Sequence, residues 1–184
     1  WMDHNIYSAA YYALPELLSE LLSVYPVIVC DGSKRQSEIY NALIAATRTP
    51  RFTYERDDET VAVLLHHPVC ARVWDTAEGR ETLNGAFDNA AEGGMARVAA
   101  LLAEKGADPN CRFNTYEDHS PLYKACFRGL VATARAILTH GGRFASDDER
   151  TRLLSQAPFA GTYASGERRR RKARRTKRLL LTLG

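Results

Sequence analysis

The chain has 184 residues, of which 45% are hydrophobic and 26% are charged. This balance excludes a wholly disordered chain, and the length allows one sizeable core or a short array of repeats. No apolar run approaches the roughly 18 residues that a membrane-spanning helix needs, so we expect an intracellular protein, cytoplasmic or nuclear, without membrane contact.

The net charge of +3 conceals an uneven distribution. Nine of the eleven residues at positions 168–178 are Arg or Lys, and removing them leaves the remainder at about −6. The four cysteines are scattered, without the paired spacing of a disulfide framework or a zinc finger, which favours a reducing compartment.

The N-terminal part of the chain predicts two helix pairs. In IYSAAYYALPELLSELLSVYP (6–26), a first-helix position at Ile6 and a second-helix position at Tyr25 lie 19 residues apart. This offset is the same as that from Phe87 to Gly106 in the central part of the chain. After a link of 14 residues, SEIYNALIAA (37–46) predicts the next helix. Its partner is TVAVLLHHP (60–68), which the chain reaches after a predicted insertion at 47–58.

The central part repeats itself with a shift of 35 residues. GAFDNAAEGG (85–94) aligns with SPLYKACFRG (120–129), and EKGAD (104–108) aligns with THGGR (139–143). A fixed period of 33 to 35 residues is typical of stacked repeats, because one helix pair cannot bury its apolar face alone.

Each part of this central pattern has a physical reason. Ser120 can cap a helix N-terminus, and Pro121 suits the first helical position because its missing N–H is not needed there. Alanine pairs allow two helices to approach closely. Gly106 and Gly141 can adopt the left-handed conformation that ends the second helix.

A last unit is predicted from SDDERTRLLSQA (146–157) and TKRLLLTLG (176–184), with an insertion at 158–175 between them. Ser146 and Glu149 fit the S-x-x-E capping box of a helix start.

The chain resembles the ankyrin repeat family in three stretches. These are SPLYKAC at the start of a first helix, AAEGG at the turn between helices, and VAALLAEKGADPN (98–110) at the second helix and its end. The resemblance implies an all-α, ankyrin-type helical repeat solenoid of four to five repeats in one domain spanning 1–184. The implied repeats are approximately 4–36, 37–81, 82–117, 118–145 and a degenerate 146–184.

In that family the first helices and the long turns form a concave face that binds other proteins. The resemblance therefore implies a non-catalytic interaction module, an adaptor or scaffold, whose partner is another protein. Aromatic and Arg side chains are frequent at interface hot spots. The predicted contact residues are Tyr11, Tyr12, Asn41, Asn89, Glu92, Arg112, Phe113, Tyr116, Lys124, Phe127 and Arg128. Asn110 resembles the Asn that stabilises the turn in many repeats of this family. Its position eight residues after Leu102 also resembles that of the Asn that is hydroxylated in some ankyrin proteins.

Other chemistry-bearing residues have structural explanations. The acidic runs at 57–59 and 147–149 precede or begin predicted helices, where carboxylates complement the helix dipole. His66, His67 and Cys70 are residue types that bind zinc. Pro68 interrupts the predicted helix between them, however, and no second cluster in the sequence supplies further ligands. No nucleophile, phosphate-binding or dinucleotide motif occurs, so we predict no enzyme activity, no cofactor and no metal.

The basic segment is open to several interpretations. It could be a nuclear localisation signal, a phosphate-binding patch for nucleic acid, the solvated start of the last helix, or a segment docked on the acidic body. It has no interleaved aromatic residues, which argues against sequence-specific base recognition. Its residues are Arg168, Arg169, Arg170, Arg171, Lys172, Arg174, Arg175, Lys177 and Arg178.

Overall fold

The computed structural model describes residues 3–24, 34–48, 57–112 and 119–156, together with positions 174, 175 and 178. Within these residues the regular structure is entirely helical, which confirms the predicted all-α class. The elements are α1 (Asp3–Tyr11), α2 (Pro15–Val24), α3 (Lys34–Thr47), α4 (Asp57–His66), the 3₁₀ helix η1 (Pro68–Cys70), α5 (Ala77–Gly93), α6 (Ala96–Glu104), α7 (Pro121–Phe127), α8 (Val131–Thr139) and α9 (Asp147–Gln156).

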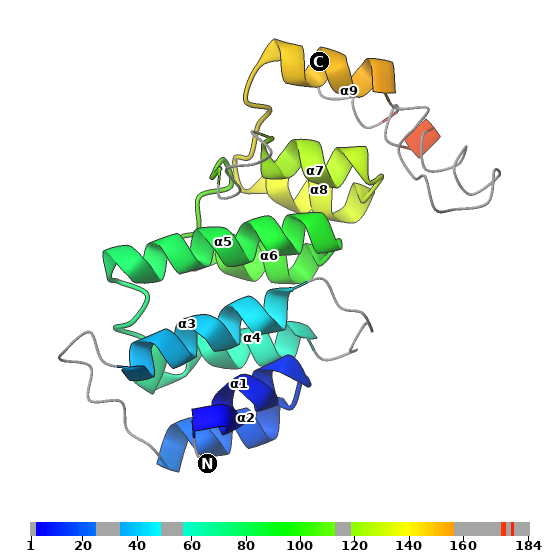
Figure 1. The fold of residues 1–184 in the computed structure, drawn as a ribbon. Coiled ribbons are helices and arrows are strands. Elements are labelled where there is room, and N and C mark those ends of the chain that lie inside the picture. The colour runs from blue at the N-terminus through cyan, green and yellow to red at the C-terminus, as the bar shows by residue number, and fades with distance from the viewer. Residues whose placement is uncertain are drawn as a thin grey trace.

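The helices form pairs that stack in chain order (Figure 1). Helices α1, α3, α5 and α7 each contact the helix that follows in the chain: α2, α4, α6 and α8 respectively. Successive odd-numbered helices also contact one another, from α1 through to α9, and α2, α4, α6 and α8 do the same. The chain therefore builds two layers, which we call the odd layer and the even layer.

Local sequence explains where the central helices begin and end. The Thr76 hydroxyl accepts a hydrogen bond from the Gly79 N–H at 3.0 Å and caps α5. The Ser120 hydroxyl accepts one from the Tyr123 N–H at 3.1 Å, with Pro121 at the first position of α7, as predicted. Gly94, with φ of 84°, ends α5 in the left-handed region that glycine adopts without a Cβ clash.

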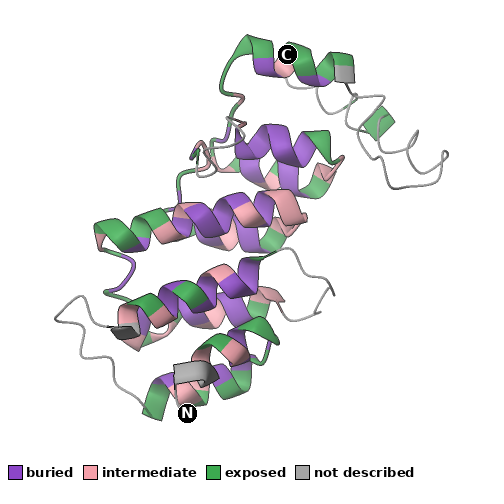
Figure 2. Cartoon of the chain, in the orientation of Figure 1, coloured by how far each residue is buried: buried purple, intermediate pink, exposed green. Residues whose placement is uncertain are grey.

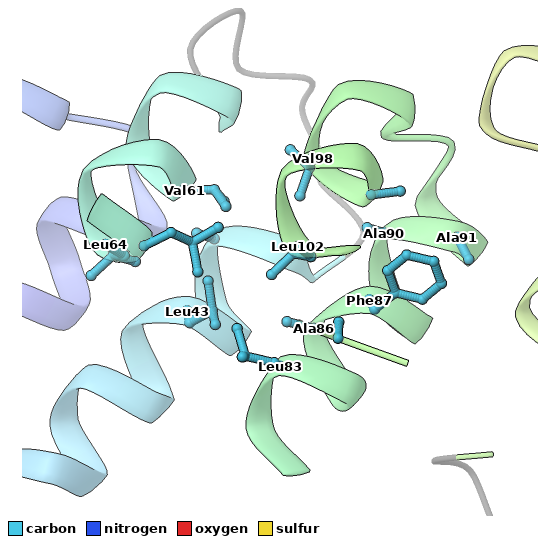
Figure 3. Close-up of a cluster of buried hydrophobic side chains, with 14 of the residues drawn as sticks. Leu43, Val61, Leu64, Leu83, Ala86, Phe87, Ala90, Ala91, Val98 and Leu102 are labelled. Carbon is cyan, nitrogen blue, oxygen red and sulfur yellow. The ribbon is translucent and has the colours of Figure 1, made fainter. Parts of the chain in front are cut away.

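A continuous hydrophobic core runs between the layers. Figure 3 shows Leu43 from α3, Leu64 from α4, Leu83 and Phe87 from α5, and Leu102 from α6 meeting in one part of it. All five side chains are fully or almost fully buried, and each such burial contributes about 1.5–3 kcal/mol to folding. Figure 2 shows that buried residues continue through the stack, whereas α2 and α9 carry many exposed positions.

Some expected boundaries differ from those of the structure. The aligned stretch at 85–94 lies within α5, which begins at Ala77, so the expected repeat boundary at 81/82 falls inside this helix. The helix predicted at 60–68 spans Asp57–His66, and Pro68 starts η1 instead. Apart from Arg178, the expected helix at 176–184 lies outside the described residues, as do most of both predicted insertions.

The acidic start of α4 gives a test of pH dependence. Burial, with a smaller contribution from the Asp58 charge, raises the pKa of Asp57 from 3.8 to about 6. The folded chain therefore holds this proton more tightly than the unfolded chain, and folding stability falls as the pH rises through this window. We expect Asp57→Asn to flatten the decline in melting temperature between about pH 4 and pH 6.

This prediction is measured by thermal unfolding of both proteins across pH 3.5–8. The control is Glu59→Gln, which changes an exposed carboxylate in the same helical turn. Parallel pH profiles for the wild type and Asp57→Asn would show that Asp57 does not carry this linkage.

Candidate protein-binding surface

A pocket of about 330 Å³ opens between the last three helices of the odd layer. It lies where α5, α7 and α9 approach, and we call it the α7 pocket. This volume is near the lower end of the range for ligand sites, and it suits one or two side chains. The lining residues are Glu92, His119, Tyr123, Lys124, Phe127, Arg128 and Arg152.

One wall of the α7 pocket is a column of stacked rings. Tyr123 and Phe127 are four residues apart, a spacing that places their side chains on one face of α7, and His119 lies just before the start of this helix. The ring centroids of His119 and Tyr123 are 4.1 Å apart, with 25° between the planes. Those of Tyr123 and Phe127 are 5.8 Å apart and tilted by only 8°. Tyr123 is buried, whereas Phe127 is 37% exposed at the open end of the column.

A buried ion pair fixes the base of this wall. The Lys124 ammonium donates hydrogen bonds to both carboxylate oxygens of Asp88, at 2.8 and 2.6 Å, and joins α7 to α5. Both side chains are only 6% exposed. Lys124 was predicted as a contact residue of the concave face, but its side chain is buried. Its charge is neutralised by Asp88, and it anchors the helix that carries the ring column.

The rim of the pocket carries accessible charge. Arg128 donates to the carboxylate of Glu92 in a second contact between α7 and α5, one helical turn beyond the buried pair. Here the side chains are 47% and 38% exposed, so water screens the pair and its contribution is about 0–1 kcal/mol. Arg152 on α9 is exposed and forms the opposite side of the rim.

The loops that follow the even helices form a second hollow, of about 350 Å³, lined by Arg112, Ser120 and Arg143 among others. Asn110 holds this region together. Its side-chain amide donates to the Gly141 carbonyl at 3.2 Å, and its side-chain oxygen accepts from the Arg143 N–H at 2.9 Å. These contacts support the turn-stabilising interpretation of Asn110, because they tie two successive loops together.

The structure brings only part of the predicted contact set together. Glu92, Lys124, Phe127 and Arg128 line the α7 pocket, and Arg112 lines the hollow beside it. The remaining described members lie elsewhere: Tyr11 and Tyr12 are exposed at the end of α1, Asn41 is exposed on α3, and Asn89 is half-buried on α5.

Phe113, Tyr116, Arg168, Arg169, Arg170, Arg171, Lys172 and Lys177 lie outside the described residues. Arg174, Arg175 and Arg178 are exposed.

Sequence reasoning missed three lining residues of the α7 pocket. The spacing of Tyr123 and Phe127 was a usable signal, since rings four residues apart on a helix can stack, whereas His119 lies before the start of α7. Arg152 gave no such signal, because its place at the rim depends on how α9 packs against α7.

In the described part of the chain, no group of three or more potential metal ligands comes together. The His67 ring instead accepts a hydrogen bond from the Val69 N–H at the start of η1. Burial raises the pKa of the Cys70, Cys111 and Cys126 thiols to about 12, which keeps them protonated and poorly nucleophilic.

None of the described helices is both long enough and apolar enough to cross a bilayer. A scan of the chain against models of protein families found no match, and a search of curated proteins found no similar sequence.

Proposed function

We propose that this chain is a non-catalytic, ankyrin-type interaction module that binds another protein on its odd layer, with the α7 pocket at the centre of the contact. In this proposal the helix stack is a rigid scaffold. Side chains on the odd helices and on the loops after the even helices select the partner.

The turn glycines support the ankyrin-type assignment. Gly94 and Gly129 follow α5 and α7, whereas Gly106 and Gly141 follow α6 and α8, and all four have φ between 72° and 109°. Each pair is 35 residues apart in the sequence, so two consecutive units use the same backbone conformation at both of their turns. Such agreement favours true repeats over two unrelated helix pairs.

The observation that carries the binding proposal is the exposed end of the ring column. Phe127 presents an aromatic surface beside the guanidinium groups of Arg128 and Arg152. Buried Tyr123 and the Asp88–Lys124 pair hold this arrangement in place before any partner arrives. Preorganised aromatic and Arg side chains around a pocket are the usual composition of an interface hot spot.

The test is a quantitative pull-down from lysate of cells that express the chain, after nuclease treatment. We expect the combined variant Phe127→Ala and Arg128→Ala to lose most of the specifically captured protein, because truncating a hot-spot residue costs about 2 kcal/mol or more of binding energy. Arg135→Ala is the matched control, since Arg135 is an exposed residue of α8 in the even layer. Equal recovery with all three proteins would contradict the proposed surface.

The competing proposal is a nucleic-acid-associated or nuclear-targeted protein that acts through the segment 168–178. Its support is the local density of cations, which would release counterions from phosphates. Changing Arg168, Arg169, Arg170 and Arg171 to Ala separates the two proposals. Loss of nucleic acid or import factors alone favours the basic segment, whereas an unchanged set of partners favours the odd layer.

A further inference from the structure

The geometry of the α7 pocket points to a specific class of partner: an acidic peptide segment with an aromatic or large aliphatic side chain next to a carboxylate. This inference rests on the proposed function, because it gives the chemistry of the partner at the same surface.

The apolar half of the ligand is specified by the ring column. Tyr123 stacks with both His119 and Phe127, so its own buried ring is already packed. Phe127 lies at the open end, and its exposed ring can continue the stack with one more apolar group. A pocket of about 330 Å³ admits such a side chain without any helix moving apart.

The charged half is specified by the cations at the rim. Lys124 is neutralised by Asp88, and Arg128 shares its charge with Glu92. Within the described part of the chain, no ion pair is found for Arg152, so its positive charge is in excess at the rim. Arg128 is also accessible, and a guanidinium has five donors, enough to bind Glu92 and a partner carboxylate together.

The same charges disfavour a polyanion without apolar groups. Glu92 is 38% exposed at the rim and repels a run of phosphates, whereas a single carboxylate can avoid it and reach Arg152. A peptide that combines one or two carboxylates with a ring satisfies both halves of the pocket. An RNA strand satisfies only the cations and is therefore an outcome of the test.

The experiment is panning of a random dodecapeptide phage library on the intact protein. Enriched sequences are then synthesised, and their affinity is measured by fluorescence anisotropy. We expect Asp or Glu within two positions of Phe, Tyr, Trp or Leu. We also expect affinity to fall about tenfold or more in the combined variant Arg128→Ala and Arg152→Ala, because a charge-assisted hydrogen bond is worth about 1.5–3 kcal/mol.

Two control proteins make the result specific to the pocket. Arg135→Ala tests an exposed Arg in the even layer, and the variant with residues 168–171 changed to Ala tests capture of acidic peptides by the basic segment. Both should bind within about twofold of the wild type, because the inference assigns peptide binding to Arg128 and Arg152 and not to these positions. Replacing the peptide's acidic residues with their amides should weaken binding about as much as removing the two rim arginines.

Four results would overturn the inference: no enriched peptides, enriched peptides without acidic residues, equal binding to the Arg128/Arg152 variant, or binding lost in the 168–171 variant. Full competition by an oligouridylate would assign the pocket to nucleic acid instead. None of these results decides the outcome of the pull-down, which tests Phe127 and Arg128 together and with natural partners instead of short acidic peptides. The peptide chemistry can therefore fail while the protein-binding proposal stands.

Discussion

Replacing Asp88 with alanine is expected to lower the free energy of unfolding by about 3–5 kcal/mol. The substitution leaves the Lys124 ammonium without its carboxylate at a site where the side chain is only 6% exposed. An uncompensated buried charge must either draw in water or release a proton, and both cost stability. The loss should be larger than removal of the side-chain packing alone would cause.

Equilibrium unfolding in urea measures this loss, and two variants show its origin. Glu92→Ala removes the exposed ion pair between the same two helices and should cost less than about 1 kcal/mol. The double variant Asp88→Leu with Lys124→Met removes both charges and should recover much of the stability, because a buried pair is often replaceable by apolar groups. If Asp88→Ala and Glu92→Ala cost the same, the buried pair is not a major stabilising contact.

The helical class and much of the element order could be predicted from the sequence, because capping residues and helical spacing are local signals. Ser120 with Pro121 marked the start of α7 correctly. The repeat pattern begins only at Gly85, whereas α5 begins eight residues earlier, where Thr76 caps a helix with two additional turns. The Tyr40 hydroxyl lies 3.0 Å from the Thr76 hydroxyl, a tertiary contact that sequence spacing does not reveal.

The first turn of the stack shows why weak repeats are hard to recognise. Ala13, between α1 and α2, has φ of 52°, although an L-residue with a Cβ pays about 1–2 kcal/mol there. The equivalent turns after α5 and α7 have glycine. The turn between α1 and α2 therefore has the same left-handed conformation without a glycine. A search of the sequence for turn glycines misses the α1–α2 pair for this reason.

The candidate site was predictable in its exposed residues and not in its buried ones. The presence of aromatic and Arg residues at first-helix positions led to the prediction of Phe127 and Arg128, which are exposed at the α7 pocket. Burial of Lys124 depends on Asp88, which lies 36 residues earlier and carries no local mark as its partner. Charge complementarity between neighbouring helices is a pairwise property, so inspection of one helix at a time does not find it.

The capping box of α9 has a larger role than its sequence indicates. The Ser146 hydroxyl accepts from the Glu149 N–H at 3.2 Å, which is one half of the predicted box. The carboxylate of Glu149 does not complete the other half within α9. It accepts from the N–H of Ala145 at 2.6 Å, and from the N–H and hydroxyl of Ser120 at 2.7 and 2.8 Å. Glu149 therefore joins the start of α9 to the start of α7.

Glu149→Ala is accordingly expected to lower the free energy of unfolding by about 3 kcal/mol, because it strands donors of Ser120 in a buried position. The loss should be concentrated at the end of the stack, since each helix pair contacts only its neighbours. Urea unfolding gives the total, and native-state hydrogen exchange locates it. The amides of α9 and of Tyr123 should exchange first, whereas those of α3 and α5 should keep their protection.

Asp148→Ala is the matched control, because it removes an exposed carboxylate from the same first turn. It retains every contact of Glu149 and should cost about 0.3–1 kcal/mol through the helix dipole. If the two variants lost the same free energy of unfolding, Glu149 would contribute no more than any carboxylate at a helix start. A larger and local loss would show that one buried carboxylate holds α9 against α7. The same contact would then keep Arg152 at the rim of the α7 pocket, so stability at the end of the stack and partner binding would depend on one side chain.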